Sequence, residues 1–258
     1  MSDEEVIVER QGAVLLVRLN RPDAMNALNM GMKECIGAAM MEAENDPRIR
    51  TVVLTGTGDR AFCAGMDLRS FATNGKELGQ GDDADAEFLR LLHGTILVPV
   101  VGAANGTAVA GGFQLLLGCD IIVASSQAQF GLPETKRGLF PAGSGMFLGT
   151  RIPLSVALEM TLTGDSIDAN RAYGLGLVNA VVEPDQVLAT AMAYAQRIAA
   201  NSPLGLAATK ELVRLGVSDA TRTAERMREL RPIVYGSEDA REGAAAFVEK
   251  RQPLWRGR

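Results

Sequence analysis

The chain has 258 residues, of which 47% are hydrophobic and 22% are charged, and its formal net charge is −5 at pH 7. A chain of this length can bury a substantial core, and its acidic balance makes nucleic acid and anionic membrane surfaces poor partners. The three cysteines are scattered and odd in number. That pattern disfavours a disulfide framework or a zinc site and favours a reducing compartment.

The N-terminal residues MSDEEVIVER are acidic and lack the basic start and the apolar core of a secretory signal. No later run is apolar and long enough to span a bilayer. We therefore expect a cytoplasmic protein without a membrane or nucleic-acid partner.

Hydrophobic patterning in the first part of the chain predicts alternating strands and helices. We expect strands at 6–9, 13–19 and 51–56, and helices at 29–44 and 86–97. The segment 58–70, GDRAFCAGMDLRS, is rich in small residues and predicts a turn. The polar, glycine-rich segment 73–84 predicts a mobile surface loop.

The stretch 103–120, AANGTAVAGGFQLLLGCD, organises the rest of the chain. It joins a short strand at Val100 and Val101 to an apolar helix that we expect to begin at Gly111 and Gly112. Glycines at a helix start leave backbone N–H groups unobstructed at the positive end of the helix dipole. Such a turn can hold a negative charge that develops during a reaction.

The second half of the chain predicts a strand at 121–124, then mainly helices from Pro153 onward, with one strand at 177–182. Repeated units of strand, small turn and helix favour an α/β fold with parallel strands and a ligand site at the strand-to-helix turns. The last sixty residues contain no convincing strand. A helical C-terminal segment with few core partners of its own favours packing between subunits.

Three chemical motifs are rejected. Residues 56–61 fit G-x-G-x-x-A after a strand, but the FCAG that follows predicts a turn where a dinucleotide fingerprint needs a helix. Ser144 lies between two glycines but lacks the glycine two positions earlier that a nucleophile elbow needs. The single histidine, His93, lies on a helix with apolar neighbours, and without clustered ligands we expect no metal site.

Three segments together resemble the enoyl-CoA hydratase/isomerase (crotonase) superfamily: AFCAGMDL (61–68), AVAGGFQL (108–115) and LPETKRGL (132–139). The similarity continues through NRPDAMNALN (20–29), LTGDSIDANRAYGLGLVNAVV (162–182) and EGAAAFVEKRQPLW (242–255). It implies a crotonase-like α/β fold, with a spiral of ββα units and an acyl-CoA site in 1–197 and a helical trimerisation segment in 198–258. A homo-trimer or a hexamer is the expected assembly.

In that family two backbone N–H groups form an oxyanion hole for the thioester carbonyl of an acyl-CoA, and the matching residues are Met66 and Gly111. Each such donor is worth about 3–4 kcal/mol in other oxyanion holes. The resemblance implies coenzyme A as part of the substrate, with no covalently bound cofactor and no metal.

The hydratases of the family place catalytic carboxylates at two positions, and this chain fills one of them. Glu134 matches the second position, while Gln114 occupies the first. A neutral amide can orient water but cannot accept its proton, so a single carboxylate favours moving a double bond from the 3,4 to the 2,3 position. The alternatives are a hydratase in which Gln114 positions the water, a catalytically silent acyl-CoA-binding protein and an RNA-binding protein of the same fold.

Other members use a carboxylate nucleophile in the loop that follows this glutamate. Residues 138–149 contain no Asp or Glu, which disfavours covalent chemistry, and Asp120 is expected to be structural.

The resemblance also implies residues that bind the CoA moiety. In the C-terminal helix, Phe247 and Lys250 match an aromatic and basic pair that approaches the nucleotide, often from a neighbouring subunit; an ordinary amphipathic helix explains the same spacing equally well. The remaining candidates surround two turns near the N-terminus: Asp23, Met25, Asn26, Ala64, Asp67 and Leu68.

Overall fold

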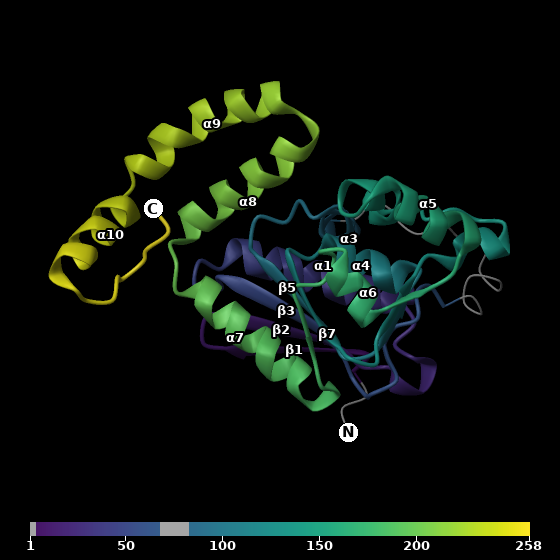
Figure 1. The fold of residues 1–258 in the computed structure, drawn as a ribbon. Helices are drawn as coiled ribbons and strands as arrows, with labels where there is room; N and C mark the ends of the chain where they lie inside the picture. The colour runs from purple at the N-terminus through teal and green to yellow at the C-terminus, as the bar shows by residue number, and fades with distance from the viewer. Residues whose placement is uncertain (1–3, 68–82) are drawn as a thin grey trace.

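The computed structural model describes residues 4–67 and 83–258, which form two β-sheets surrounded by helices (Figure 1). The larger sheet has the order β1 (Val6–Gln11), β2 (Val14–Leu19), β3 (Thr51–Gly56), β5 (Val100–Ala104), β7 (Ile121–Ser125), β10 (Ala180–Val182). The smaller sheet has the order β4 (Ala61–Cys63), β6 (Thr107–Val109), β8 (Gln129–Gly131), β9 (Ile167–Asp168).

From β3 to β8, successive strands of the chain alternate between the two sheets. β3, β5 and β7 pair in parallel in the larger sheet, while β4, β6 and β8, which follow them in turn, pair in parallel in the smaller one. Helices α3 (Asp83–His93) and α4 (Gly111–Gly118) end the first two of these units. The arrangement confirms the expected crotonase-like spiral of ββα units.

Helices cover both faces of the larger sheet, which explains why its central strands are buried throughout. In β2, the side chains of Leu15 and Val17 join the main core, whereas Val14 and Leu16 join a second cluster under α7 (Val187–Ala199). The main core is completed by α1 (Met30–Asn45), α3 and α4. Alternate residues of a strand point to opposite faces of the sheet, so a continuous apolar run packs against the helices on both faces.

Several local expectations were wrong. The FCAG segment was predicted as part of a turn, but Ala61–Cys63 forms β4, because three residues are too few to show a period and their pairing with β6 is a tertiary effect. The helix expected at 86–97 is α3, which begins at Asp83 and is followed by Gly94 at φ +68°. The short strands β6, β8 and β9 were not predicted, and the strand expected at 177–182 is confined to β10. Most of the loop expected at 73–84 lies outside the described residues.

The second half of the chain is mainly helical, as expected. Besides α7 it contains the α-helices α5 (Leu154–Thr163) and α6 (Ala169–Gly174) and three short 3-10 helices, η2 (Pro133–Arg137), η3 (Ser144–Thr150) and η4 (Pro184–Gln186). An earlier 3-10 turn, η1 (Pro22–Ala24), follows β2. None of the helices in the described ranges is long and apolar enough to cross a bilayer.

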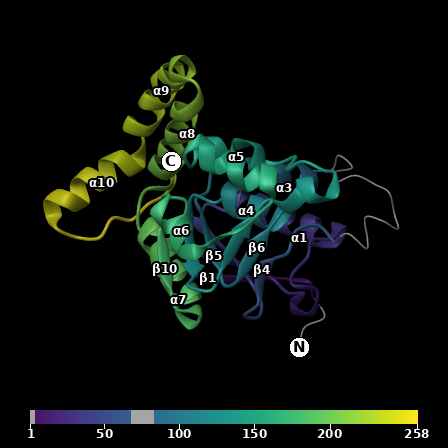
Figure 2. The same ribbon diagram turned by 45° about the vertical axis from the view of Figure 1, so that its right-hand side comes forward.

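The last three helices form an arm that leaves the α/β body. Helices α8 (Pro203–Ser218), α9 (Ala220–Tyr235) and α10 (Glu238–Glu249) stand apart from the two sheets in both ribbon views (Figures 1 and 2). Neither α8 nor α9 contains a buried residue. The boundary predicted between residues 197 and 198 falls near the end of α7, and the division into core and oligomerisation segment stays a prediction.

A polar cluster fixes α8 to the body. The carboxylate of Asp120 accepts a hydrogen bond from the Val100 N–H (2.8 Å) and pairs with Lys210 (2.7 Å) and Arg214 (2.8 Å). Lys210 as a residue is half-buried, but its side chain is only 8% exposed; this loss of solvent lowers the pKa of Lys210, and the charge of Asp120 opposes the shift. These contacts give Asp120 the structural role expected from the sequence.

Candidate active site

Glu134 presents a buried carboxyl group in η2, directly after β8. Its Oε1 accepts a hydrogen bond from Nε2 of Gln114 at 2.9 Å. Its Oε2 is buried and has no hydrogen-bond partner in the described part of the chain. Burial raises the pKa of Glu134, while its own main-chain N–H, the hydrogen bond from Gln114 and the charge of Arg137 partly oppose the rise. A carboxylate with a raised pKa is a stronger base than an exposed one, which suits this group to accepting a proton and releasing it again.

Gln114 lies in α4, one turn after Gly111, and its side-chain amide has a defined orientation. Its Oε1 accepts hydrogen bonds from the N–H groups of Gly143 (2.8 Å) and Gly145 (3.4 Å). Its main-chain oxygen accepts a third from Ser144 Oγ (2.7 Å). The Gly-Ser-Gly segment, rejected above as a nucleophile elbow, therefore braces Gln114. Sequence reasoning missed this contact, which depends on how η3 packs on α4.

The N–H groups of Met66 and Gly111 lie close together, as the predicted oxyanion hole requires. Leu28 bonds the residues on either side of Met66, donating to Gly65 O (2.7 Å) and accepting from Asp67 N–H (2.8 Å), so the N–H of Met66 points the other way. Gly111 is the first residue of α4, where the N–H lacks a helical partner. Neither group donates to an acceptor among the described residues.

Small residues bring the two donors together. A Cβ on Gly111 would lie 3.7 Å from Met66 N, and one on Gly65 would lie 2.8 Å from the Cβ of Ala110. Ala110 itself has φ +48° and ψ −128°, a conformation that ordinarily belongs to glycine. Such a residue stores about 1–3 kcal/mol of strain, which the surrounding structure must overcome. Its N–H bonds Gly131 O (2.9 Å), and this strained turn sets the direction of the Gly111 N–H.

Three predicted CoA-binding residues border the turn that carries Met66. Asp23 and Met25 are exposed, and Met25 has φ +51°. Ala64 is half-buried and its N–H bonds Met25 O at 3.0 Å. Their position beside a predicted oxyanion donor is compatible with a CoA cradle, which stays a prediction.

The other three predicted residues near this turn differ in character. Asn26 is buried, and its side-chain amide bonds Thr57 O (3.0 Å) and Ala61 O (2.9 Å), so it holds the turn together from within. Asp67 pairs with Arg21 at 3.2 Å. Leu68 lies outside the described residues.

Phe247 and Lys250 are not brought to the site by their own chain. Phe247 is 85% exposed on α10, and Lys250 caps the end of that helix at φ +53°. Both ribbon views place α10 away from α4 (Figures 1 and 2). A role in CoA binding therefore requires a neighbouring subunit.

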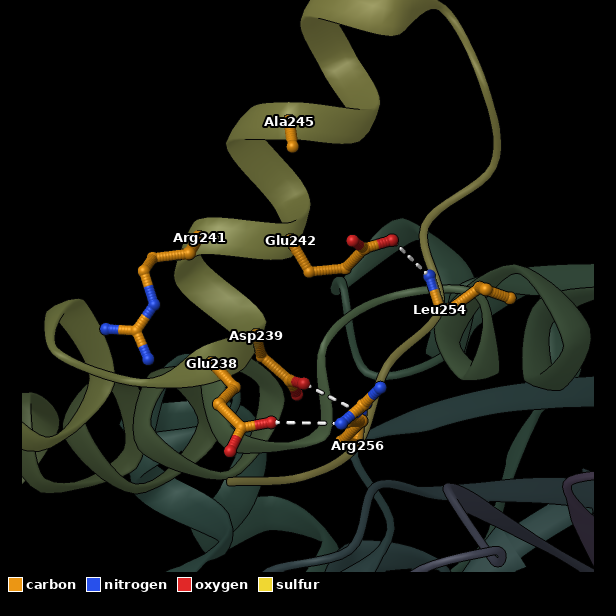
Figure 3. A pocket seen from close by; sticks show the side chains of 7 residues that line it. All are labelled: Glu238, Asp239, Arg241, Glu242, Ala245, Leu254 and Arg256. Atoms are coloured by element: carbon orange, nitrogen blue, oxygen red, sulfur yellow. Dashed lines mark hydrogen bonds and ion pairs between the residues drawn. The ribbon is translucent and has the colours of Figure 1, made fainter.

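A cavity of about 400 Å³ lies between α10 and the C-terminal tail (Figure 3). Helix α10 lies away from α4, the helix that contains Gln114, in both ribbon views (Figures 1 and 2). Several polar groups of the cavity already bind the tail: Asp239 accepts from the Arg256 N–H and Glu242 from the Leu254 N–H, both at 2.7 Å. These contacts tie the tail to the helix. Within the described ranges, no three His, Cys, Asp or Glu side chains gather closely enough to hold a metal ion.

The family model described as enoyl-CoA hydratase/isomerase matches residues 9–258. The chain belongs to this family. A relative named carnitinyl-CoA dehydratase, from Proteus mirabilis (strain HI4320), is 37% identical over 260 residues, which cover 96% of this chain and 97% of the relative.

Solved structures of family members agree with the fold. The enoyl-CoA hydratase from Mycobacterium tuberculosis H37Rv has a TM-score of 0.90 and 42% identity, covering 98% of this chain and 99% of that one. The carnitinyl-CoA hydratase from Mycobacterium avium has a TM-score of 0.78 and 40% identity, with both chains fully covered. These relatives are named as hydratases or dehydratases, so their names do not support the preference for isomerisation predicted from the sequence.

Proposed function

We propose that this chain forms the enolate of an acyl-CoA thioester, with the N–H groups of Met66 and Gly111 holding the oxygen and Glu134 moving the proton. The leading reaction is isomerisation of a 3-enoyl-CoA to a 2-enoyl-CoA. The observation that carries the proposal is the buried Glu134 carboxyl group, whose Oε2 has no described protein partner. Through Gln114 this group is bonded to the helix that begins at Gly111.

The proton and electron changes balance with one carboxylate. The C2–H bond breaks and its proton moves to Oε2 of Glu134, while the electron pair shifts toward the thioester oxygen between the two N–H donors. Return of the proton to C4 then moves the double bond to the 2,3 position and restores the carboxylate. A raised pKa assists this cycle, because the same group must accept and release the proton.

Hydration or dehydration is the second candidate, and the names of the relatives favour it. For this reaction Glu134 would exchange a proton with water or with a 3-hydroxyl group, and carnitinyl-CoA becomes one substrate to test. The contacts of Gln114 argue against a role for this residue in binding the water alongside Glu134. Its oxygen already accepts two backbone hydrogen bonds, so it is poorly placed to accept one from water.

A panel of matched thioesters tests the proposal: a 3-enoyl-CoA, a 2-enoyl-CoA and a 3-hydroxyacyl-CoA of one chain length, with carnitinyl-CoA added. Products are followed by ultraviolet absorbance and mass. We expect isomerisation by the wild type and a loss of about 10²–10⁴-fold in kcat for Glu134→Gln, with little change in KM.

Glu183→Gln makes the same chemical change at an exposed position and should leave the rates unchanged. Efficient hydration or dehydration without isomerisation would favour the second candidate. Turnover of none of these thioesters would contradict an enzymatic role and favour acyl-CoA binding alone.

A further inference from the structure

We infer that Gln114 is a positioning residue: its amide holds Oε1 of Glu134 and leaves Oε2 as the only atom of that carboxyl group free to carry the proton. The inference deepens the proposed function and rests on it. It gives Gln114 a task different from holding the water of a hydratase.

The orientation of the Gln114 amide follows from its surroundings. Two backbone N–H groups, of Gly143 and Gly145, point at one end of the amide, so that end must be the oxygen. A flipped amide would set its NH₂ group against two donors. The NH₂ group is thereby directed at Glu134, where Nε2 lies 2.9 Å from Oε1.

A carboxylate at position 114 could make only one of the two sets of contacts, those to Gly143 and Gly145 but not the one to Glu134. It could accept from Gly143 and Gly145 as the amide does. Its second oxygen, however, would face Oε1 of Glu134 at hydrogen-bond distance, where the two could approach only by sharing a proton or by moving apart. A neutral donor is the side chain that satisfies both neighbours while Glu134 stays ionised.

Few other charges act on Glu134 from the elements packed around it. Helix α4 and η3 carry no charged residue, and the one acid of α5, Glu159, is paired with Arg171 at 2.7 Å. Within η2, Lys136 is paired with Asp165 at 2.6 Å. Among the described groups, the main-chain N–H of Glu134 itself, the hydrogen bond from Gln114 and the charge of Arg137 favour the ionised form against burial, and Gln114 is the only other side chain that does so by a hydrogen bond.

The test compares Gln114→Glu and Gln114→Met with the wild type, using Gln127→Glu at an exposed position as the matched control. Exchange of the C2 protons of a 3-enoyl-CoA with D₂O is followed by NMR across the pH range. Gln114→Glu keeps the acceptor for Gly143 and Gly145 but loses the donor to Glu134. Gln114→Met loses both.

For Gln114→Glu we expect exchange at neutral pH to fall by about 10- to 100-fold, the effect of losing a hydrogen bond to a charged group, with KM nearly unchanged. The acid limb of the pH profile should move to higher pH, because loss of the donor and addition of a like charge both raise the pKa of Glu134. Gln114→Met should move the limb in the same direction. The control should match the wild type.

Other outcomes overturn the inference. An acid limb for Gln114→Glu that coincides with that of the wild type would show that Gln114 only braces the loop at Gly143. If Gln114→Glu hydrates a 2-enoyl-CoA faster than the wild type does, and the acid limb of its pH profile is unchanged, then the residue at position 114 positions the water. If Gln114→Met fails to fold, Gln114→Glu still decides, because it keeps the loop contacts. Absence of exchange in the wild type would instead contradict the proposed function.

Discussion

At the scale of single residues, Glu134, the proposed catalytic carboxylate, lies in an environment that is unfavourable for its charge. Burial removes its carboxylate from water, and of its two oxygens only Oε1 has a hydrogen-bond partner among the described residues. The folded protein therefore holds the proton of Glu134 more tightly than the unfolded chain does, and its pKa rises above 4.5. Burying this carboxylate destabilises the fold, and under the proposed function the same burial makes it a stronger base.

The raised pKa predicts how Glu134→Gln changes stability with pH. A group with a raised folded pKa makes the free energy of unfolding fall as pH rises from the unfolded value through the folded one. At pH 7 the neutral amide should therefore give a higher Tm than the wild type, although we expect the variant to be nearly inactive. Below pH 4.5, where the wild-type carboxyl group is also protonated, the two Tm values should converge.

Calorimetric scans from pH 4 to pH 8 measure this difference, with Glu183→Gln as the control that should follow the wild type throughout. A lower Tm for Glu134→Gln at neutral pH would show that Glu134 stabilises the fold, contrary to the sign derived from its burial.

At the scale of elements, the site depends on close contact between β4 and the start of α4. A Cβ on Gly112 would lie 2.1 Å from the carbonyl oxygen of Cys63, which is backbone and cannot move aside. The helix therefore packs directly on the strand that leads to Met66. This contact sets the distance between the two predicted oxyanion donors.

Gly112→Ala should push these elements apart. We expect a loss of at least about 1–3 kcal/mol in stability, as for other overpacked cores, together with a fall in kcat larger than the change in KM. Gly216→Ala is the matched control, because Gly216 is exposed in α8, where an added Cβ would meet no atom within 4 Å, and this variant should gain up to about 1 kcal/mol. Denaturant unfolding and thioester kinetics measure both effects. Equal, small effects of the two substitutions would show that the contact is not tight.

The elements of the body could largely be predicted from the sequence, because long apolar runs such as 51–56 and the glycine pair at 111–112 carry strong local signals. The start of α4 follows those predictions. The hydrogen bond between Gln114 and Glu134 was not predicted, because the resemblance gave only their positions in the chain. Strand β4 and the strained Ala110 could not be predicted, since tertiary pairing creates the first and imposes the second. The orientation of the Gln114 amide likewise depends on η3, whose glycines predict only turns.

At the scale of the whole molecule, the arm of α8, α9 and α10 is attached to the body mainly by polar contacts and leaves apolar side chains exposed. Helices α8 and α9 bury no residue, and α9 and α10 leave Ile233 and Phe247 58% and 85% exposed. The anchor at Asp120 fixes the start of the arm, and the tail contacts of Asp239 fix its end. An arm held in place with open apolar faces supports the predicted trimer or hexamer, in which a neighbour covers them.

In such an assembly Phe247 and Lys250 should reach the nucleotide of a CoA bound to the adjacent subunit. The assembly itself is measured first: light scattering should give the mass of a trimer or of a dimer of trimers. Phe247→Ala and Lys250→Ala should each raise KM for an acyl-CoA by about 10-fold, through lost stacking or lost phosphate contact, while kcat changes little. Neither substitution should change the KM for the matched acyl-pantetheine, which lacks the nucleotide. Arg241→Ala, which removes an exposed charge from the same helix, is the control. Equal losses with both thioesters, at an unchanged mass, would contradict a nucleotide contact, and a monomer at micromolar concentration would contradict the shared site altogether.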